Sequence, residues 1–91
     1  MKKEFIDPFI KILPTLDLHR EPREAAVWLL NDFININLKM KKYKLVVIHG
    51  KGYGIIRKSV HEYLSKDKRV SKYYLYGFND GLTIIELKRD E

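Results

Sequence analysis

Cysteine is absent from the sequence, which excludes disulfide bonds, thiolate nucleophiles and zinc sites built from cysteines. Long apolar runs are absent too, since no stretch approaches the ~20 residues that a membrane-spanning helix needs. The first residues, MKKEF, lack the apolar segment of a secretory signal. These absences predict a soluble protein of the cytoplasm with no membrane partner.

Acidic residues are fewer than basic residues. The chain has 12 acidic and 18 basic residues, a net charge of +6 and a pI near 9.6. Such an excess favours a polyanionic partner such as nucleic acid, through phosphate neutralisation and counterion release. The alternative is a lysine-rich surface that binds nothing in particular. The 91 residues, 45% of them hydrophobic, are enough for one compact domain.

Hydrophobic periodicity predicts four strands and two helices. Residues 1–14, punctuated by Pro8 and Pro14, are expected to form an arm that docks on a domain spanning residues 15–91. The predicted elements are strands at 15–19, 44–49, 70–76 and 82–88, a helix from Pro22 to about Met40, and a helix whose buried stripe includes Ile56 and Leu64. Residues 77–81 would join the last two strands as a hairpin. This order predicts an α/β fold with a mostly parallel four-stranded sheet and a final antiparallel strand.

Polar residues follow two of the predicted strands. In open α/β sheets, ligands bind beyond the carboxyl ends of the parallel strands. Residues 17–19 and 49–52 should therefore share one edge of the sheet, and the hairpin loop with Asp80 should lie there if its first strand runs parallel to the others. The lysine-rich segment 39–44 falls at the opposite edge, where a solvated turn is the expected interpretation.

The pair Asp17 and His19 is the first candidate for chemistry. Residues two apart on a strand point to the same face, so the carboxylate can orient the imidazole for general acid–base catalysis. The alternative is structural: Asp17 would cap the following helix, and His19 would be a histidine satisfied at the end of its strand.

Glycine is scarce, with five residues in the chain, yet three of them fall in the segment HGKGYG at positions 49–54. Glycines allow close backbone approach and positive φ, and Gly54 directly precedes a helix whose N-terminal amides attract anions. With Lys51 and Arg57 nearby, the loop suits a phosphate. A plain tight turn is the alternative. The segment is not a P-loop, because no Gly-Lys-Ser/Thr follows at the required spacing.

The remaining histidines are ambiguous. His49 could be a second acid–base group, a ligand, or a donor to the loop that follows it, and His61 is expected to lie on the surface of its helix. A metal site from Asp17, His19 and His49 is conceivable, with a divalent ion such as Mg²⁺, but three groups without fixed geometry favour it only weakly.

Several of these residues together resemble a known family. The segments LDLH (16–19), IHGKGYGIIR (48–57) and DGLTIIEL (80–87) are similar to the motifs of the small MutS-related, or Smr, domain, over about residues 15–88. The resemblance implies a two-layer βαβαββ sandwich in a stand-alone member, nucleic-acid binding, and often endonuclease activity. Some members nick DNA, and others cleave RNA in connection with stalled translation, which adds the ribosome as an expected partner.

Carried over by motif, the resemblance implies catalytic roles for three residues, Asp17, His19 and Arg57. It assigns phosphate contact to the glycine-loop segment and its basic neighbours: Arg20, His49, Gly50, Lys51, Gly52, Gly54 and Lys58. Arg20 stands where the family commonly has glycine after LDLH.

The sequence therefore leaves three hypotheses. The first is an endonuclease that cleaves DNA or RNA with His19 as acid or base, where Arg57 and loop amides stabilise the charged transition state. The second is a binder of nucleic acid or ribosomes without hydrolysis. The third is a scaffold whose loop holds a carboxylate or phosphate of a partner.

Overall fold

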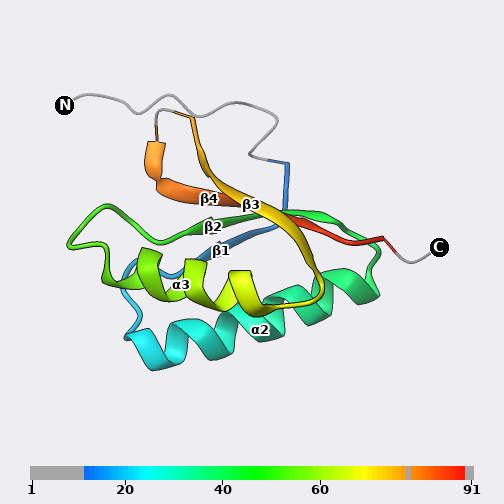
Figure 1. The fold of residues 1–91 in the computed structure, drawn as a ribbon, viewed down its shortest axis with the longest axis horizontal. Helices are drawn as coiled ribbons and strands as arrows, with labels where there is room; N and C mark the ends of the chain where they lie inside the picture. The colour runs from blue at the N-terminus through cyan, green and yellow to red at the C-terminus, as the bar shows by residue number, and fades with distance from the viewer. Residues whose placement is uncertain (1–11, 78, 90–91) are drawn as a thin grey trace.

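The computed structural model describes residues 12–77 and 79–89 and shows an α/β fold with a four-stranded mixed sheet. Both helices lie on one face of the sheet (Figure 1). The elements, in chain order, are β1 (Thr15–Asp17), α2 (Arg23–Lys39), β2 (Lys44–Ile48), α3 (Ile55–Lys66), β3 (Val70–Tyr76) and β4 (Asn79–Leu87). The predicted number, type and order of the elements are correct within these residues.

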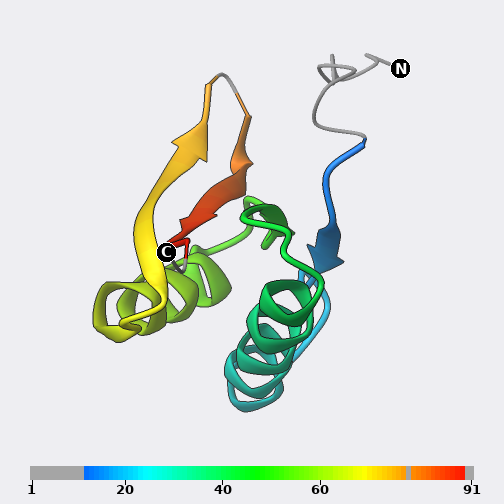
Figure 2. The same ribbon diagram turned by 90° about the vertical axis from the view of Figure 1, so that its right-hand side faces the viewer.

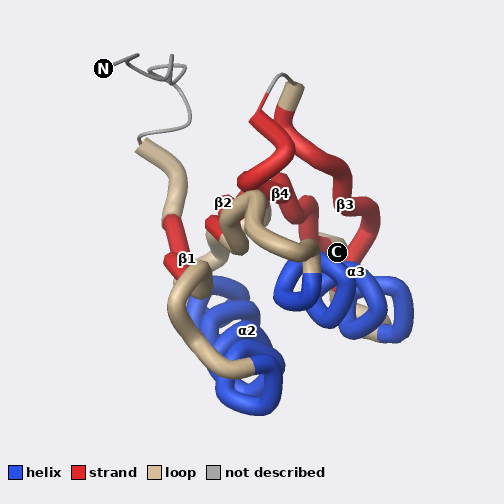
Figure 3. Tube along the Cα trace, turned by 90° about the vertical axis from the view of Figure 1, so that its left-hand side faces the viewer, coloured by secondary structure: helices blue, strands red, loops and turns tan. Residues whose placement is uncertain are grey.

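The prediction of a mostly parallel sheet is wrong. The strand order is β1-β2-β4-β3, which is visible in Figure 3. Within the described residues, β1 and β2 form the one parallel pair, and β4 is antiparallel to both β2 and β3. Three strands thus run in the same direction, as expected, but the last strand inserts between β2 and β3 instead of adding at the edge. The reason is that β4 carries apolar residues on both faces, which a central strand can bury.

The main core lies between the sheet and the two helices. Alternate residues of each central strand point into it, so that Leu45 and Val47 of β2 join Ile85 and Leu87 of β4. From the helices, the buried residues of this cluster are Ala26, Leu30, Ile34, Val60 and Leu64. Figure 2 shows the two helices side by side beneath the strands. At about 25 cal/mol per Å² of apolar surface, this burial is the main stabilising contribution to the fold.

The face of the sheet away from the helices has a second, smaller apolar cluster. Val46, Leu82 and Ile84 are buried there, and Leu13 packs against them. Because β2 alternates between the two clusters, its continuous apolar run is explained by burial on both faces, as predicted. The expected docking of the arm falls mostly on residues 1–11, which lie outside the described residues, so it stays a prediction.

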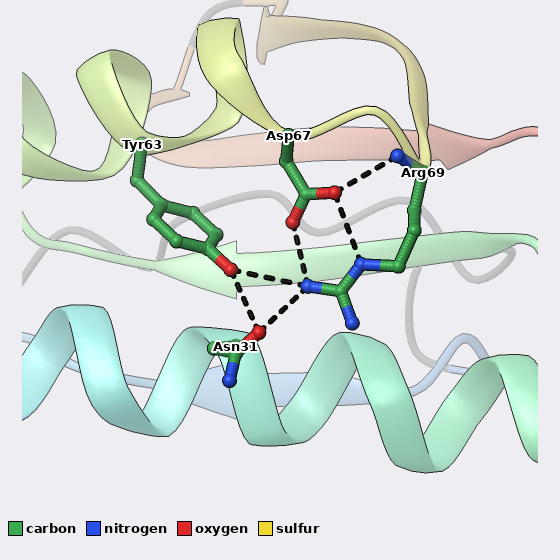
Figure 4. Close-up of polar contacts among 4 residues, drawn as sticks. All are labelled: Asn31, Tyr63, Asp67 and Arg69. Atoms are coloured by element: carbon green, nitrogen blue, oxygen red, sulfur yellow. Dashed lines mark hydrogen bonds and ion pairs between the residues drawn. The ribbon is translucent and has the colours of Figure 1, made fainter.

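A polar cluster joins the two helices at the end of α3 (Figure 4). The Arg69 guanidinium donates to Asp67 through Nη2 at 2.6 Å and Nε at 3.0 Å, and Nη2 also lies 2.7 Å from Oδ1 of Asn31 on α2. The Tyr63 hydroxyl donates to the same Asn31 oxygen at 2.8 Å. The Arg69 guanidinium holds the pKa of Asp67 below its usual value. The cluster fixes α3 against α2.

Candidate functional site

The candidate site begins where β1 ends. The Asp17 carboxylate accepts a hydrogen bond from Nδ1 of His19, and its Oδ1 also accepts from the His19 backbone amide at 3.1 Å. With Nδ1 protonated, the neutral ring presents a lone pair at Nε2, which accepts from Nε of Arg20 at 3.1 Å. The pair is partly open to solvent, with 42% of the His19 side chain and 52% of the Asp17 side chain exposed. The predicted orientation of an imidazole by a carboxylate is therefore present.

The hydrogen bond from the His19 ring lowers the pKa of Asp17, against a smaller opposing effect of burial. Asp17 is accordingly a carboxylate at neutral pH. The alternative in which Asp17 caps the next helix is wrong, because Pro22 occupies the N-cap of α2 and no side chain caps it.

Gly50 brings the glycine loop against this pair. Its φ is +78°, and a Cβ at this position would lie 3.1 Å from Cβ of His19, so a side chain would both strain the backbone and crowd the imidazole. The backbone amides of His49 and Gly50 donate to the Gly81 carbonyl of β4 at 3.0 and 3.1 Å. Next to Gly81, the pairing of β3 with β4 shifts register, because Leu75 pairs with Thr83 but Tyr76 pairs with Asn79.

This register shift corrects the predicted hairpin. The loop was expected to span residues 77–81, but β4 begins at Asn79, so Asp80 and Gly81 belong to the strand. The expected position at the site edge is nevertheless correct, since Nζ of Lys51 lies 3.8 Å from Oδ1 of Asp80. Both side chains are more than half exposed, so this ion pair contributes little stability.

The other end of the loop leads into α3. Gly54 is the N-cap residue with a φ of +76°, and a Cβ there would lie 3.1 Å from Nη2 of Arg57, so the guanidinium folds back over the start of the helix. The amide of Lys58 donates to the Gly54 carbonyl at 2.9 Å as the helix begins. Gly52 differs: its φ is not in the left-handed region, and nothing lies within 4 Å of a Cβ placed on it. Of the two properties expected of the loop glycines, positive φ does not apply to Gly52, and close backbone approach to a phosphate stays a prediction.

His49 is buried beneath the loop, with 5% of its surface exposed. Its Nδ1 lies 3.0 Å from the Gly50 carbonyl oxygen, which can only accept, so Nδ1 carries the proton. Nε2 of His49 then accepts from the Thr83 hydroxyl at 2.7 Å, and that hydroxyl accepts from Nε2 of His61 at 2.8 Å. A directed chain of hydrogen bonds thus runs from α3 through β4 to the glycine loop. Of the alternatives for His49, hydrogen bonding to the loop is the one observed.

Burial lowers the pKa values of both His49 and His61, and the Arg57 charge lowers them further. Both rings are therefore held neutral, as the directed chain requires. Sequence reasoning missed this chain and placed His61 on the surface, whereas the ring is half-buried and makes an edge contact with Tyr73, at 5.1 Å between centroids. A signal existed: Thr83 is a polar residue between the apolar Leu82 and Ile84 of β4.

The suggested metal ligands do not come together as a cluster. No group of three or more histidine, cysteine, aspartate or glutamate side chains is placed to hold a metal ion within residues 12–77 and 79–89. His49 points into the core with both ring nitrogens hydrogen-bonded, while Asp17 and His19 contact each other. These three side chains do not fit a shared metal site.

The motifs and their arrangement can now be compared with known proteins. A family model described as "Smr domain" matches residues 16–88. The chain belongs to the Smr domain family. The resemblance first seen in the segments LDLH and HGKGYG is thereby confirmed over most of the chain.

Similar curated proteins carry this Smr domain as a small part of a larger chain. Endonuclease MutS2 of Finegoldia magna is 40% identical over 76 residues, which cover 80% of this chain and 10% of that protein. Endonuclease MutS2 of Leuconostoc mesenteroides is 38% identical over 77 residues, with 81% and 10% covered. The chain therefore spans about a tenth of the length of these relatives.

Solved structures show the same fold. The Smr domain of Thermus thermophilus MutS2 superimposes with a TM-score of 0.83 at 24% identity, covering 85% of this chain and all of that one. YdaL, a stand-alone small MutS-related protein from Escherichia coli, gives a TM-score of 0.79 at 20% identity, covering 98% of this chain and 82% of that one. In the part of the chain described here, none of the helices has the length and apolar character needed to cross a bilayer.

Proposed function

We propose that this Smr domain binds nucleic acid and cleaves its phosphodiester backbone. The observation that carries the proposal is the carboxylate–imidazole pair of Asp17 and His19, held against Gly50 of the glycine loop. A protein that only binds polyanions needs cations and amides, but it has no use for an oriented imidazole. The +6 net charge and the relatives named as endonucleases support the same conclusion.

His19 acts as the proton-transferring group. Asp17 fixes the tautomer in which Nδ1 is protonated, which leaves Nε2 to take a proton from the attacking water or ribose hydroxyl. The imidazolium formed in this way can then donate that proton from Nε2 to the leaving oxygen. Asp17 remains ionised throughout, as its lowered pKa indicates, and so stabilises the imidazolium when it forms.

Arg20 covers the reactive nitrogen in the absence of substrate. Its Nε donates to Nε2 of His19, so the lone pair is occupied. A phosphate is a stronger acceptor for a guanidinium than a neutral imidazole, because the hydrogen bond becomes charge-assisted. Arrival of the backbone phosphate would draw Arg20 away and release Nε2 for catalysis.

The glycine loop and the start of α3 hold the phosphate. Arg57 and the first helical amides supply positive charge where negative charge develops in the transition state. Lys51 and Lys58 contact neighbouring phosphates, while Gly52, open on its side-chain face, lets the backbone approach closely. His49 contributes indirectly, because its ring is buried and positions Gly50 through the hydrogen bond to the carbonyl.

Incubation of labelled single- and double-stranded DNA and RNA with the purified protein tests the proposal. Parallel reactions with Mg²⁺ and with EDTA decide whether a divalent ion is required. We expect cleavage by the wild type and its loss in His19→Ala, with binding retained. Undiminished cleavage by His19→Ala, after contaminating nucleases are excluded, would contradict the mechanism.

The second candidate function is nucleic-acid or ribosome binding without hydrolysis. It is favoured by the same Arg20 contact, since a permanently covered Nε2 would leave His19 as a structural residue. Arg20→Gly, which restores the residue common in the family, separates the two. Faster cleavage by Arg20→Gly than by the wild type supports the proposal that substrate displaces Arg20 from His19. If the wild type and the variant both bind nucleic acid but neither cleaves it, the function is binding without hydrolysis.

A further inference from the structure

A hollow beside the glycine loop shares Arg57 and Lys58 with the proposed cleavage chemistry, which gives no role to most of its other lining residues. It runs along α3, has a volume of about 590 Å³ and falls within the size range of ligand sites. The residues that line it are Tyr53, Gly54, Arg57, Lys58, His61, Glu62, Ser65 and Tyr73. Two tyrosine rings, one imidazole, two cations and one carboxylate therefore surround a single space next to the glycine loop.

Tyr53 is the unusual member of this set. Its side chain is 100% exposed between Gly52 and Gly54, although a tyrosine ring gains free energy by burial. Ile55, two residues further on, is 56% exposed. No fold-stabilising role is available to a ring with no covered surface. On its Gly52 side, nothing lies within 4 Å of a Cβ placed on the glycine, and on its Gly54 side the nearest side chain is the Arg57 guanidinium. A flat planar ligand can therefore reach it.

The charges of the hollow indicate what kind of planar ligand it accepts. Arg57 and Lys58 lie at the loop end, so an attached phosphate belongs there. Glu62 is one helical turn after Lys58 and repels phosphate from the far end, but its carboxylate can accept hydrogen bonds from the amino group of a base. At the inner wall, Tyr73 and His61 present rings already in contact with each other.

We propose that the hollow takes an unpaired nucleobase, with Tyr53 stacking on it and Arg57 and Lys58 holding the adjoining phosphate. This inference rests on the proposed function and adds the substrate class: single-stranded or locally unpaired nucleic acid. Base-paired duplex does not suit the site, because its bases are stacked on one another and their faces cannot reach Tyr53. Base–aromatic stacking is tolerant of sequence, so the preference concerns pairing state and not base identity.

The test is fluorescence anisotropy with labelled single strands of roughly ten nucleotides, a length within the range that one single-strand-binding domain covers. The DNA and RNA strands are each compared with the same sequence as duplex. All proteins carry His19→Ala so that the strands are not cut. Tyr53→Ala should weaken single-strand binding by about tenfold, the scale of one lost base stack, and Tyr53→Phe should restore it. Duplex binding should change less than about twofold.

Tyr74→Ala is the matched control, since Tyr74 is also an exposed tyrosine but lies on β3 and donates to Glu86. It should leave single-strand binding unchanged. Equal binding of single strands and duplex, unaffected by Tyr53→Ala, would overturn the base site while leaving the proposed function intact. Failure of the His19→Ala protein and the wild type to bind any of the strands or duplexes would overturn both.

Discussion

Both ends of the sheet carry basic residues, but they differ in backbone conformation and in the other side chains placed there. At one end, left in Figure 1, β1 and β2 lead into the Asp17–His19 pair and the glycine loop. At the other end the lysine turn, residues 39–44, joins α2 to β2. This turn borders a hollow of about 450 Å³ lined by three lysines and by Arg89, whose guanidinium lies 4.6 Å above the Tyr43 ring.

Charge alone therefore does not distinguish a site from a solvated surface. The glycine-loop end adds an oriented imidazole, two glycines in left-handed backbone and the N-terminus of α3. The lysine turn has a left-handed residue as well, but it is Lys41, with a φ of 59° and a side chain that keeps ligands from the backbone. Cations attract a polyanion at either end, whereas the glycine-loop end alone of the two carries the groups to which the proposed function gives positioning and proton-transfer roles.

The largest expected effect is on catalysis. Asp17→Asn and His19→Ala should each lower the cleavage rate about 10²-fold or more, the scale of lost general acid–base catalysis, because one removes the orienting charge and the other the proton-transferring ring. Affinity should change by less than ~1 kcal/mol, since phosphate binding falls to other groups. Single-turnover kinetics and anisotropy on the same substrate measure the two quantities.

The matched control is the double variant Lys41→Ala, Lys42→Ala at the lysine turn. It should cleave at the wild-type rate. A rate loss comparable to that of His19→Ala would show that the wrong end of the sheet has been assigned.

The next effect is on stability and compares glycines within the loop. Gly50→Ala should lower the free energy of unfolding by about 1–3 kcal/mol, because it strains a left-handed residue and presses Cβ against His19. At Gly52 the φ is not positive and nothing lies within 4 Å of an added Cβ, so Gly52→Ala should change the free energy of unfolding by less than about 0.5 kcal/mol. Urea denaturation gives both values. Equal stability of the two variants would contradict the close approach of Gly50 to His19.

The glycine-loop end should also make stability depend on pH. His49 and His61 have pKa values below the ordinary 6.5, chiefly because of burial, so the unfolded chain binds protons where the folded chain does not. Their contribution to the free energy of unfolding is fully present above pH ~6.5. It is lost as the pH falls from there toward the pKa values of the two histidines in the folded protein. Urea unfolding across this range should show the decline. His61→Gln should reduce it, and an unchanged decline would exclude His61 as a contributor.

The smallest effect is electrostatic. If Arg20, Arg23, Lys51, Arg57 and Lys58 together neutralise about four phosphates, the log–log slope of affinity against salt should be near −3. Lys51→Ala should make that slope shallower by up to about one, and the double variant of the lysine turn should leave it unchanged. Titrations at several salt concentrations measure the slope. A larger change from the lysine turn would mean that nucleic acid binds at that end.

The elements could be predicted because each has a local signal. The continuous apolar run of β2 and the helical spacing of α2 and α3 depend on near neighbours only. The place of β4 depends on which strands it meets, and a hairpin with β3 forms equally well at the edge or in the centre. Leu82 and Ile84 on one face and Ile85 and Leu87 on the other were the signal for the centre.

In the candidate site too, contacts between residues close in the sequence could be predicted, and contacts between distant residues could not. Asp17 and His19 are two residues apart, so strand spacing predicted a contact between them. The contact exists, but β1 ends at Asp17 and His19 lies in the turn that follows. The links from His61 through Thr83 to His49 join residues 22 and 34 positions apart in the sequence, and they exist only because β4 lies next to β2 and faces α3. An incorrect strand order hides such contacts.

The central position of β4 also bears on how the domain is made. During translation, β1, β2 and β3 are synthesised before β4. Neither β2 nor β3 can pair with its neighbour β4 until that strand has been made. Such long-range pairing is slow to form and cannot begin early. Gly81 of β4 supplies the carbonyl that anchors His49 and Gly50. A nascent chain stopped short of residue 79 would therefore have neither a complete sheet nor an anchored glycine loop, and the proposed cleavage site would be incomplete until the strand is synthesised.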